Sequence, residues 1–170
     1  KVMMNEGGYV AGGFARRIIR DASLKNVKQH FDRRGDIDFF FETGAGFVKT
    51  MTVLNDAHCH FTRTMANNAW MCMTSIRHTA DLMEAIGDEN GYSSILLQLI
   101  DCHFGAPEHM LSTFDFDNCK FAFNATHVWF DDEALDLEEC KILRANPNAS
   151  KLDLLGSRVC KYFSKSINDG

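Results

Sequence analysis

The sequence predicts an α/β (α+β) fold, with an α/β core followed by a helical C-terminal part. Short apolar runs with strand character alternate with amphipathic helical segments along most of the chain, whereas the end carries only helical patterns. The 170 residues, 45% of them apolar and 24% charged, suit a folded unit with a buried core. We therefore predict a core over residues 1–131 and a helical extension over residues 132–170, within one compact unit.

The N-terminal third predicts a strand, a helix and a second strand. Residues Tyr9 to Ala11 form a short apolar run between two glycine pairs, which favours a buried strand. The segment 14–22 predicts a helix, since Phe14, Ile18, Ile19 and Ala22 recur at helical spacing. After a polar and basic stretch, residues Asp36 to Phe41 predict the next strand.

The middle of the chain predicts further alternation of strands and helices. Pro107 suits the first turn of a short helix, because proline lacks the N–H that this position does not need. The expected helices are 47–55, 79–86 and 107–111, and the expected strands are one or two within 62–75, then 94–100, 114–123 and 127–130.

The tail predicts two helices. Asp131 and Asp132 are candidate caps for the first, which we expect to continue through Leu143, with Pro147 just beyond its end. The second helix is expected to begin near Ser150, and its apolar stripe comprises Leu152, Leu155, Val159, Phe163 and Ile167.

Composition and charge exclude several classes of protein. The formal net charge of −5 argues against extensive coating of nucleic acid. No apolar run is long enough to span a bilayer, so we expect no membrane partner. The six cysteines are widely spaced, and no apolar leader is visible, so we expect reduced, mostly buried thiols and a cytoplasmic location.

The strongest candidate site combines the Gly12–Gly13 turn with the pair Asp36 and Asp38. A glycine pair lets backbone approach a triphosphate, and the helix that follows directs free N–H groups at the phosphates. Alternate residues of a strand share a face, so Asp36 and Asp38 project together while Ile37 turns into the core. Neighbouring carboxylates repel each other and suit Mg²⁺ or Mn²⁺, which nucleotidyl transfer requires.

A third carboxylate is expected on the predicted strand 114–123. Asp115 and Asp117 alternate with phenylalanines there and would share one face. We prefer Asp115 as the third metal ligand, with Asp117 as the alternative. A zinc site at His58–Cys59–His60 is the weaker metal hypothesis, because no second ligand pair of suitable spacing lies nearby.

The run from Ala11 to Arg16, followed by Gly35 to Phe40, resembles the signature of the polymerase-β nucleotidyltransferase superfamily. That signature is a Gly-Gly pair opening a helix and an Asp-x-Asp on the next strand. The Gly-Gly-x-x-Arg form looks most like the CCA-adding and poly(A) polymerase branch and like small phage nucleotidyltransferase-like proteins. Arg17 departs from the CCA-adding branch, in which an Asp usually follows the Arg.

The resemblance implies a mixed sheet flanked by helices and transfer of a nucleoside monophosphate from an NTP such as ATP or CTP. It implies Asp36, Asp38 and Asp115 as catalytic and metal-binding residues with Mg²⁺ or Mn²⁺. The residues expected to bind the nucleotide are Gly12, Gly13, Arg16, Arg17, Arg158 and Lys161. For the arginines and the lysine, the alternative is that they simply form solvated basic faces of helices.

The acceptor would be an RNA, a protein side chain or a small molecule, and a phage-encoded protein would act in the host cytoplasm. The rival hypothesis is a catalytically inactive binding or interaction module with the same fold. The sequence does not predict the oligomeric state.

Overall fold

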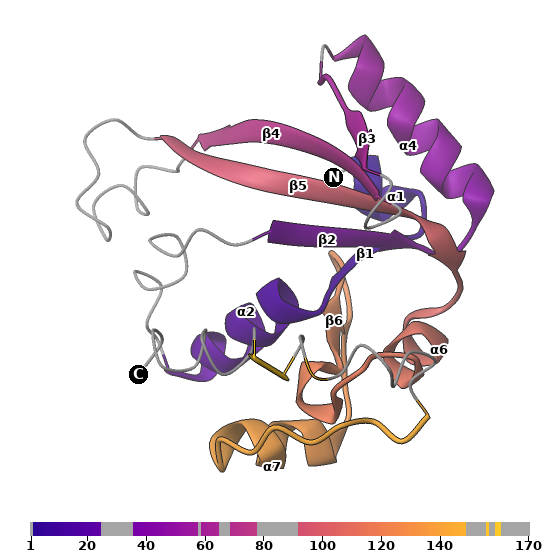
Figure 1. The fold of residues 1–170 in the computed structure, drawn as a ribbon. Helices are drawn as coiled ribbons and strands as arrows, with labels where there is room; N and C mark the ends of the chain where they lie inside the picture. The colour runs from indigo at the N-terminus through magenta and orange to yellow at the C-terminus, as the bar shows by residue number, and fades with distance from the viewer. Residues whose placement is uncertain are drawn as a thin grey trace.

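The computed structural model describes residues 2–24, 36–57, 59–64, 69–77, 92–148, 156 and 159–160. Its centre is a seven-stranded sheet with the order β3-β4-β5-β2-β1-β6-β7 (Figure 1). Strand β2 pairs with β5 in parallel, and the other neighbouring pairs are antiparallel. The expected α/β (α+β) fold with a mixed sheet is therefore confirmed.

Most of the expected strands and helices occur in the structure. The strands are β1 (Gly8–Ala11), β2 (Asp36–Phe41), β3 (Thr62–Thr64), β4 (Ala69–Arg77), β5 (Tyr92–Phe104), β6 (Phe121–Phe123) and β7 (Val128–Phe130). The helices are α1 (Val2–Asn5), α2 (Gly13–Leu24), α4 (Gly44–Asp56), α6 (Pro107–Ser112), the 3-10 turn η1 (Asp117–Cys119) and α7 (Asp132–Glu139). The helix expected over 79–86 lies outside the described residues.

The sheet buries apolar side chains on both of its faces. Val10 joins one core cluster with Ile37 and Phe39, whereas its neighbours Tyr9 and Ala11 join a second cluster on the opposite face. Helices α2 and α4 pack against the first cluster, and α6 packs against the second. Strand β1 is buried along its whole length, and Gly12, the first residue of the turn that follows it, is buried as well.

The expectation of a strand over 114–123 is wrong for most of that segment. Only Phe121–Phe123 is strand, and Asp115 lies in a bend. The physical reason is that the backbone here bonds to a later segment: Asp117 N–H donates to the carbonyl of Arg144, and Phe116 forms a bridge with Ala145. Phe116 and Asp117 therefore pair with the segment that follows α7 and not with a strand of the sheet.

Helix α7 begins where the sequence indicated but ends earlier than Leu143. The Asp131 side chain accepts a hydrogen bond from the N–H of Glu133, as an N-cap does. At the other end Lys141 has a φ of 55°, and the N–H of Ile142 donates to the carbonyl of Leu137. This is the Schellman arrangement, which terminates the helix by a left-handed residue without a glycine.

All six cysteines carry thiols rather than disulfides, as expected, but they are not mostly buried. Cys72 and Cys119 are buried, whereas Cys102, Cys140 and Cys160 are exposed. The sequence could not indicate this difference, because no local pattern distinguishes a cysteine that will be buried from one that will be exposed. Within the described ranges, no helix combines the length and apolar character needed to cross a bilayer.

Candidate functional site

The glycine turn between β1 and α2 has a conformation that requires glycine. Gly12 has a φ of +80°, its N–H donates to the carbonyl of Phe121, and its carbonyl accepts from the N–H of Arg16. A Cβ at Gly12 would lie 3.8 Å from Oδ2 of Asp38 and 3.7 Å from the Phe114 ring. The turn therefore brings backbone close to the Asp38 carboxylate.

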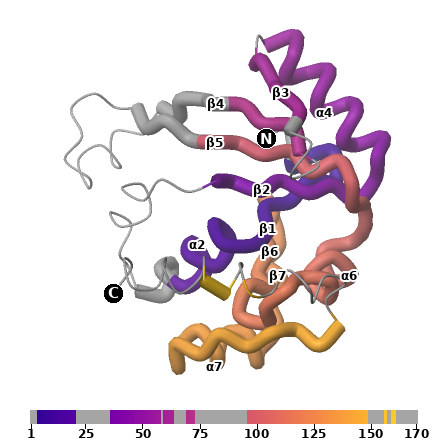
Figure 2. The backbone as a smooth tube through the Cα atoms, viewed as in Figure 1, coloured from indigo at the N-terminus to yellow at the C-terminus, as the bar shows by residue number. Residues whose placement is uncertain are grey.

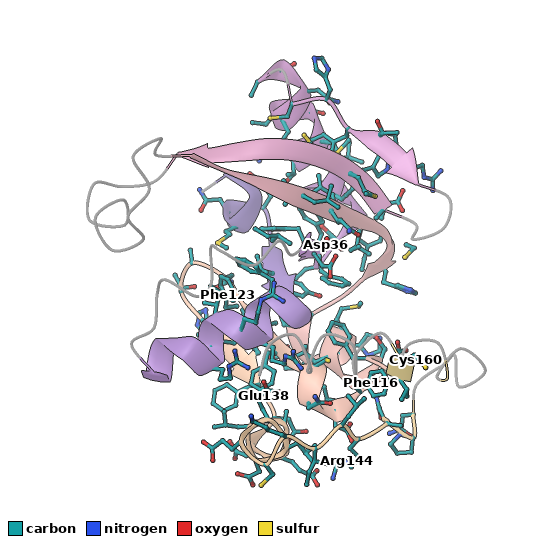
Figure 3. All side chains as sticks on the ribbon, turned by 60° about the vertical axis from the view of Figure 1, so that its left-hand side comes forward. Asp36, Phe116, Phe123, Glu138, Arg144 and Cys160 are labelled. Atoms are coloured by element: carbon teal, nitrogen blue, oxygen red, sulfur yellow. The ribbon has the colours of Figure 1, made fainter. Side chains whose placement is uncertain are left out.

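The acidic pair lies on one face of β2, as the alternation predicted. The exposure along this strand alternates, so that Ile37 is buried, Asp36 is exposed and Asp38 is partly buried. Asp36, labelled in Figure 3, is the first residue of the strand. Asp38 stands opposite Ala11 across the antiparallel pairing with β1, which explains its proximity to the glycine turn.

The register on the other side of β2 reveals a polar neighbour of Asp38 that the sequence pattern does not indicate. Gln98 of β5 is the parallel partner of Asp38, and it is only 6% exposed. Paired positions of neighbouring strands share a face of the sheet, so Gln98 stands on the side of Asp38. A glutamine within the apolar run 94–100 was the sequence signal for a buried polar side chain. Placing Gln98 next to Asp38 required the strand register.

The arginines of α2 do not form a solvated basic face. Arg16 Nη1 lies 3.4 Å from Oε2 of Glu138, and Arg20 Nη1 lies 3.1 Å from Oε1 of the same carboxylate. Arg17 is 8% exposed, and its guanidinium lies 5.8 Å from the centre of the Phe14 ring. Glu138, labelled in Figure 3, thus ties α2 to α7.

The two candidates for the third carboxylate lie in different environments. Asp115 lies in a bend rather than a strand, and its backbone carbonyl accepts a hydrogen bond from the N–H of Asn146. Asp117 is buried, and its carboxylate lies 2.6 Å from Nζ of Lys120 and 2.6 Å from Nε of Arg144. Asp117 is therefore engaged by two cations of the protein itself.

The ion pairs around Asp117 form a network that reaches α7. Burial alone would raise the pKa of Asp117, but the hydrogen bonds and positive charges of Lys120 and Arg144 hold that pKa below its usual range. Arg144 also binds Glu133, and this hydrogen bond lowers the pKa of the glutamate. The network attaches the segment after α7 to η1.

The described residues contain no group of three or more His, Cys, Asp or Glu side chains arranged to hold a metal ion. Asp36, Asp38 and Asp115 are all among these residues, so the structure does not gather them into one three-carboxylate group. Metal binding by Asp36 and Asp38, with carboxylate oxygens suited to Mg²⁺ or Mn²⁺, stays a prediction.

Several other predicted residues lie outside the part of the chain that the structure describes. They are His58 of the zinc hypothesis and Arg158 and Lys161 of the nucleotide site. Their predicted roles stay predictions.

The comparison with protein families identifies the chain. The family model described as "Gad2: Gabija anti-defense 2 family protein" matches residues 1–138, so the chain belongs to this family. No curated protein matches the chain. The assignment to the polymerase-β nucleotidyltransferase superfamily is therefore wrong: the matching model is that of the anti-defense family, and the Gly-Gly and Asp-x-Asp patterns that suggested the superfamily are short.

Proposed function

We propose, from its membership of the Gabija anti-defense 2 family, that the chain is an interaction module that counteracts the Gabija defence by binding one of its proteins. The family match over residues 1–138 carries this proposal. It covers the whole seven-stranded sheet and nearly all of α7, so the assignment concerns the folded core and not an appendage.

The geometry of the acidic site supports binding over catalysis. Two-metal transfer chemistry commonly uses a set of converging carboxylates, and the described residues provide no group of three potential ligands. Asp117, one candidate for the third ligand, is neutralised by Lys120 and Arg144. A protein that acts by occupying a surface needs no such group, because its affinity comes from complementary contacts.

The test measures Gabija protection in cells with and without this chain, and binding of the purified chain to the purified Gabija proteins. An Asp36→Ala/Asp38→Ala double variant provides the decisive comparison. We expect the wild-type chain to abolish protection and bind, and the double variant to do both equally well. Absence of binding by the wild-type chain would refute the interaction role, and loss of inhibition in a folded double variant that still binds would favour catalysis.

Metal-dependent nucleotidyl transfer is the second candidate function, and one local arrangement favours it. The Gly12 turn faces the Asp38 carboxylate at close range, and the buried Nε of Arg16 has no hydrogen-bond partner within the described ranges. Asp36 and Asp38 would hold Mg²⁺ or Mn²⁺, which would neutralise charge on the phosphates of an ATP or CTP substrate. Gly12 and Gly13 would then contact those phosphates through the backbone.

This activity is tested with each α-labelled NTP, Mg²⁺ or Mn²⁺, and total RNA or lysate as the acceptor source. The control is again the Asp36→Ala/Asp38→Ala variant. Label transferred by the wild-type chain and absent with the variant would establish an enzyme and identify the acceptor as RNA or protein. Equal labelling in both samples, or none, would exclude a role for this carboxylate pair in transfer.

A further inference from the structure

The two edges of the sheet differ in chemistry. At one edge, β3 has the sequence Thr-Arg-Thr, and Thr62 and Arg63 are exposed. At the other edge lies β7 (Figure 2), where Val128 is 55% exposed and Phe130 is 43% exposed. Polar and charged side chains protect an edge from pairing with another chain, whereas an apolar edge invites it. Of these two terminal strands, β7 therefore has the character of a docking surface.

The same two residues of β7 also direct their backbone groups outward. The N–H of Asn124 donates to the carbonyl of His127, so these two residues form a hydrogen-bonded pair at the end of the β6–β7 hairpin. Antiparallel pairs alternate between hydrogen-bonded and non-hydrogen-bonded. Counting from Asn124 and His127 along the register, the pairs Phe123–Val128 and Phe121–Phe130 are therefore the non-hydrogen-bonded ones.

An independent hydrogen bond agrees with this count. The carbonyl of Phe121 accepts from the N–H of Gly12, so it points toward the glycine turn and away from β7. In a non-hydrogen-bonded pair both residues direct N–H and C=O away from each other. The N–H and C=O groups of Val128 and Phe130 consequently face the open side of β7, where the sheet order provides no further strand among the described residues.

Acidic side chains follow this edge directly. The chain continues from Phe130 into Asp131 and α7, and the exposed carboxylates there are those of Asp131, Asp132, Glu133, Asp136 and Glu139. Glu133 is paired with Arg144, and the other four form no ion pair within the described part of the chain. Asp131 and Asp132 follow Phe130 directly, so the end of the open edge that leads into α7 is negative and favours a positively charged partner there.

We infer that the β7 edge is the surface that receives the Gabija partner, as an added strand from an extended segment of that protein. This inference rests on the interaction role proposed above. The segment would pair its backbone with Val128 and Phe130, place an apolar side chain against them, and carry Lys or Arg opposite the start of α7. Main-chain bonds supply affinity in this mode, and the side chains supply specificity.

The test compares matched substitutions on two faces of the full chain. Val128→Lys puts a charge on the edge, which is how natural edge strands avoid pairing. Val48→Lys is the control, because Val48 of α4 is 61% exposed and lies on another element. We expect Val128→Lys to weaken binding to the purified Gabija proteins by about tenfold or more and to reduce inhibition in cells, with no effect of Val48→Lys.

Two further variants separate the backbone and charge contributions. Val128→Pro removes the outward N–H but no bond of the β6–β7 ladder, so it should weaken binding while preserving the melting temperature. Asp136→Lys should slow association and reduce its salt dependence, whereas Asp56→Lys on α4 should not. Asp56 is also exposed.

The outcomes distinguish this inference from the proposed function. If wild-type and Val128→Lys chains bind and inhibit equally, the edge is not the docking surface, although the interaction role stands. If the wild-type chain does not bind, both proposals fail. A wild-type homodimer that Val128→Lys converts to monomer would also overturn the inference, because the occupant of the edge would then be a second copy of this chain.

Discussion

Gly46→Ala in helix α4 tests the packing between this helix and the segment before β1. A Cβ at Gly46 would lie 2.3 Å from the carbonyl oxygen of Glu6, about 0.7 Å inside the 3.0 Å that real Cβ atoms keep. The neighbour is backbone and cannot rotate away, so α4 or the Glu6 segment must shift. Such overpacking costs about 1–3 kcal/mol, and we expect the upper end of that range.

Helix propensity acts in the opposite direction. Alanine is more favourable than glycine within a helix by about 1 kcal/mol, so we expect a net loss near 2 kcal/mol for Gly46→Ala. For a chain of this size the loss corresponds to a decrease in melting temperature of roughly 4–8 °C.

Thermal unfolding of wild type, Gly46→Ala and Gly44→Ala measures the effect. Gly44 opens the same helix, and the nearest atom to its added Cβ is 3.6 Å away in the Phe104 ring, which is an ordinary contact. We expect Gly44→Ala to melt at or slightly above the wild-type temperature. A melting temperature of Gly46→Ala equal to or above that of wild type would refute the argument from the Glu6 contact.

The remaining predictions concern the network after α6 and the thiols. Asp117→Asn should destabilise the fold by about 1.5–3 kcal/mol at neutral pH, because it removes charged hydrogen bonds. Since the folded pKa of Asp117 is lowered, its contribution is full above about pH 4 and is lost as the pH falls below that, so wild type and variant should converge in acid. Asn146→Ala should cost about 1–3 kcal/mol in urea unfolding, because the buried amide donates to two carbonyls. In the native state, a thiol reagent should label exposed Cys102 faster than Cys72, whose pKa burial raises.

Matched controls accompany these three predictions. Asp136→Asn alters an exposed carboxylate and should leave the free energy of unfolding unchanged at every pH. If this control also lost stability at neutral pH and matched wild type in acid, the pH dependence could not be assigned to Asp117. Asn148→Ala, at an exposed side chain, is the control for Asn146→Ala, and equal losses would contradict the role of the buried amide. Peptide mapping measures the labelling rate of each thiol in the native protein. Equal rates for Cys102 and Cys72 would contradict their different burial.

Elements with a strong local pattern could be predicted from the sequence. Strand β2 matches its predicted bounds of Asp36 to Phe41, because alternation places Ile37 and Phe39 in the core whatever the neighbouring strands are. Helix α6 and the cap at Asp131 follow in the same way from Pro107 and from the acidic first turn. These features depend on residues within one or two turns of each other, so the sequence alone contains their cause.

Features that depend on distant residues required the tertiary structure. The segment around Asp117 has the alternation of a strand, yet its backbone bonds to Arg144 and its carboxylate pairs with cations, which local alternation does not contain. Register places Gln98 beside Asp38, and strand order leaves β7 at an open edge. The chain by itself thus determined the fold class and the shared face of Asp36 and Asp38. Long-range pairing decided which charges are neutralised and which surface stays open.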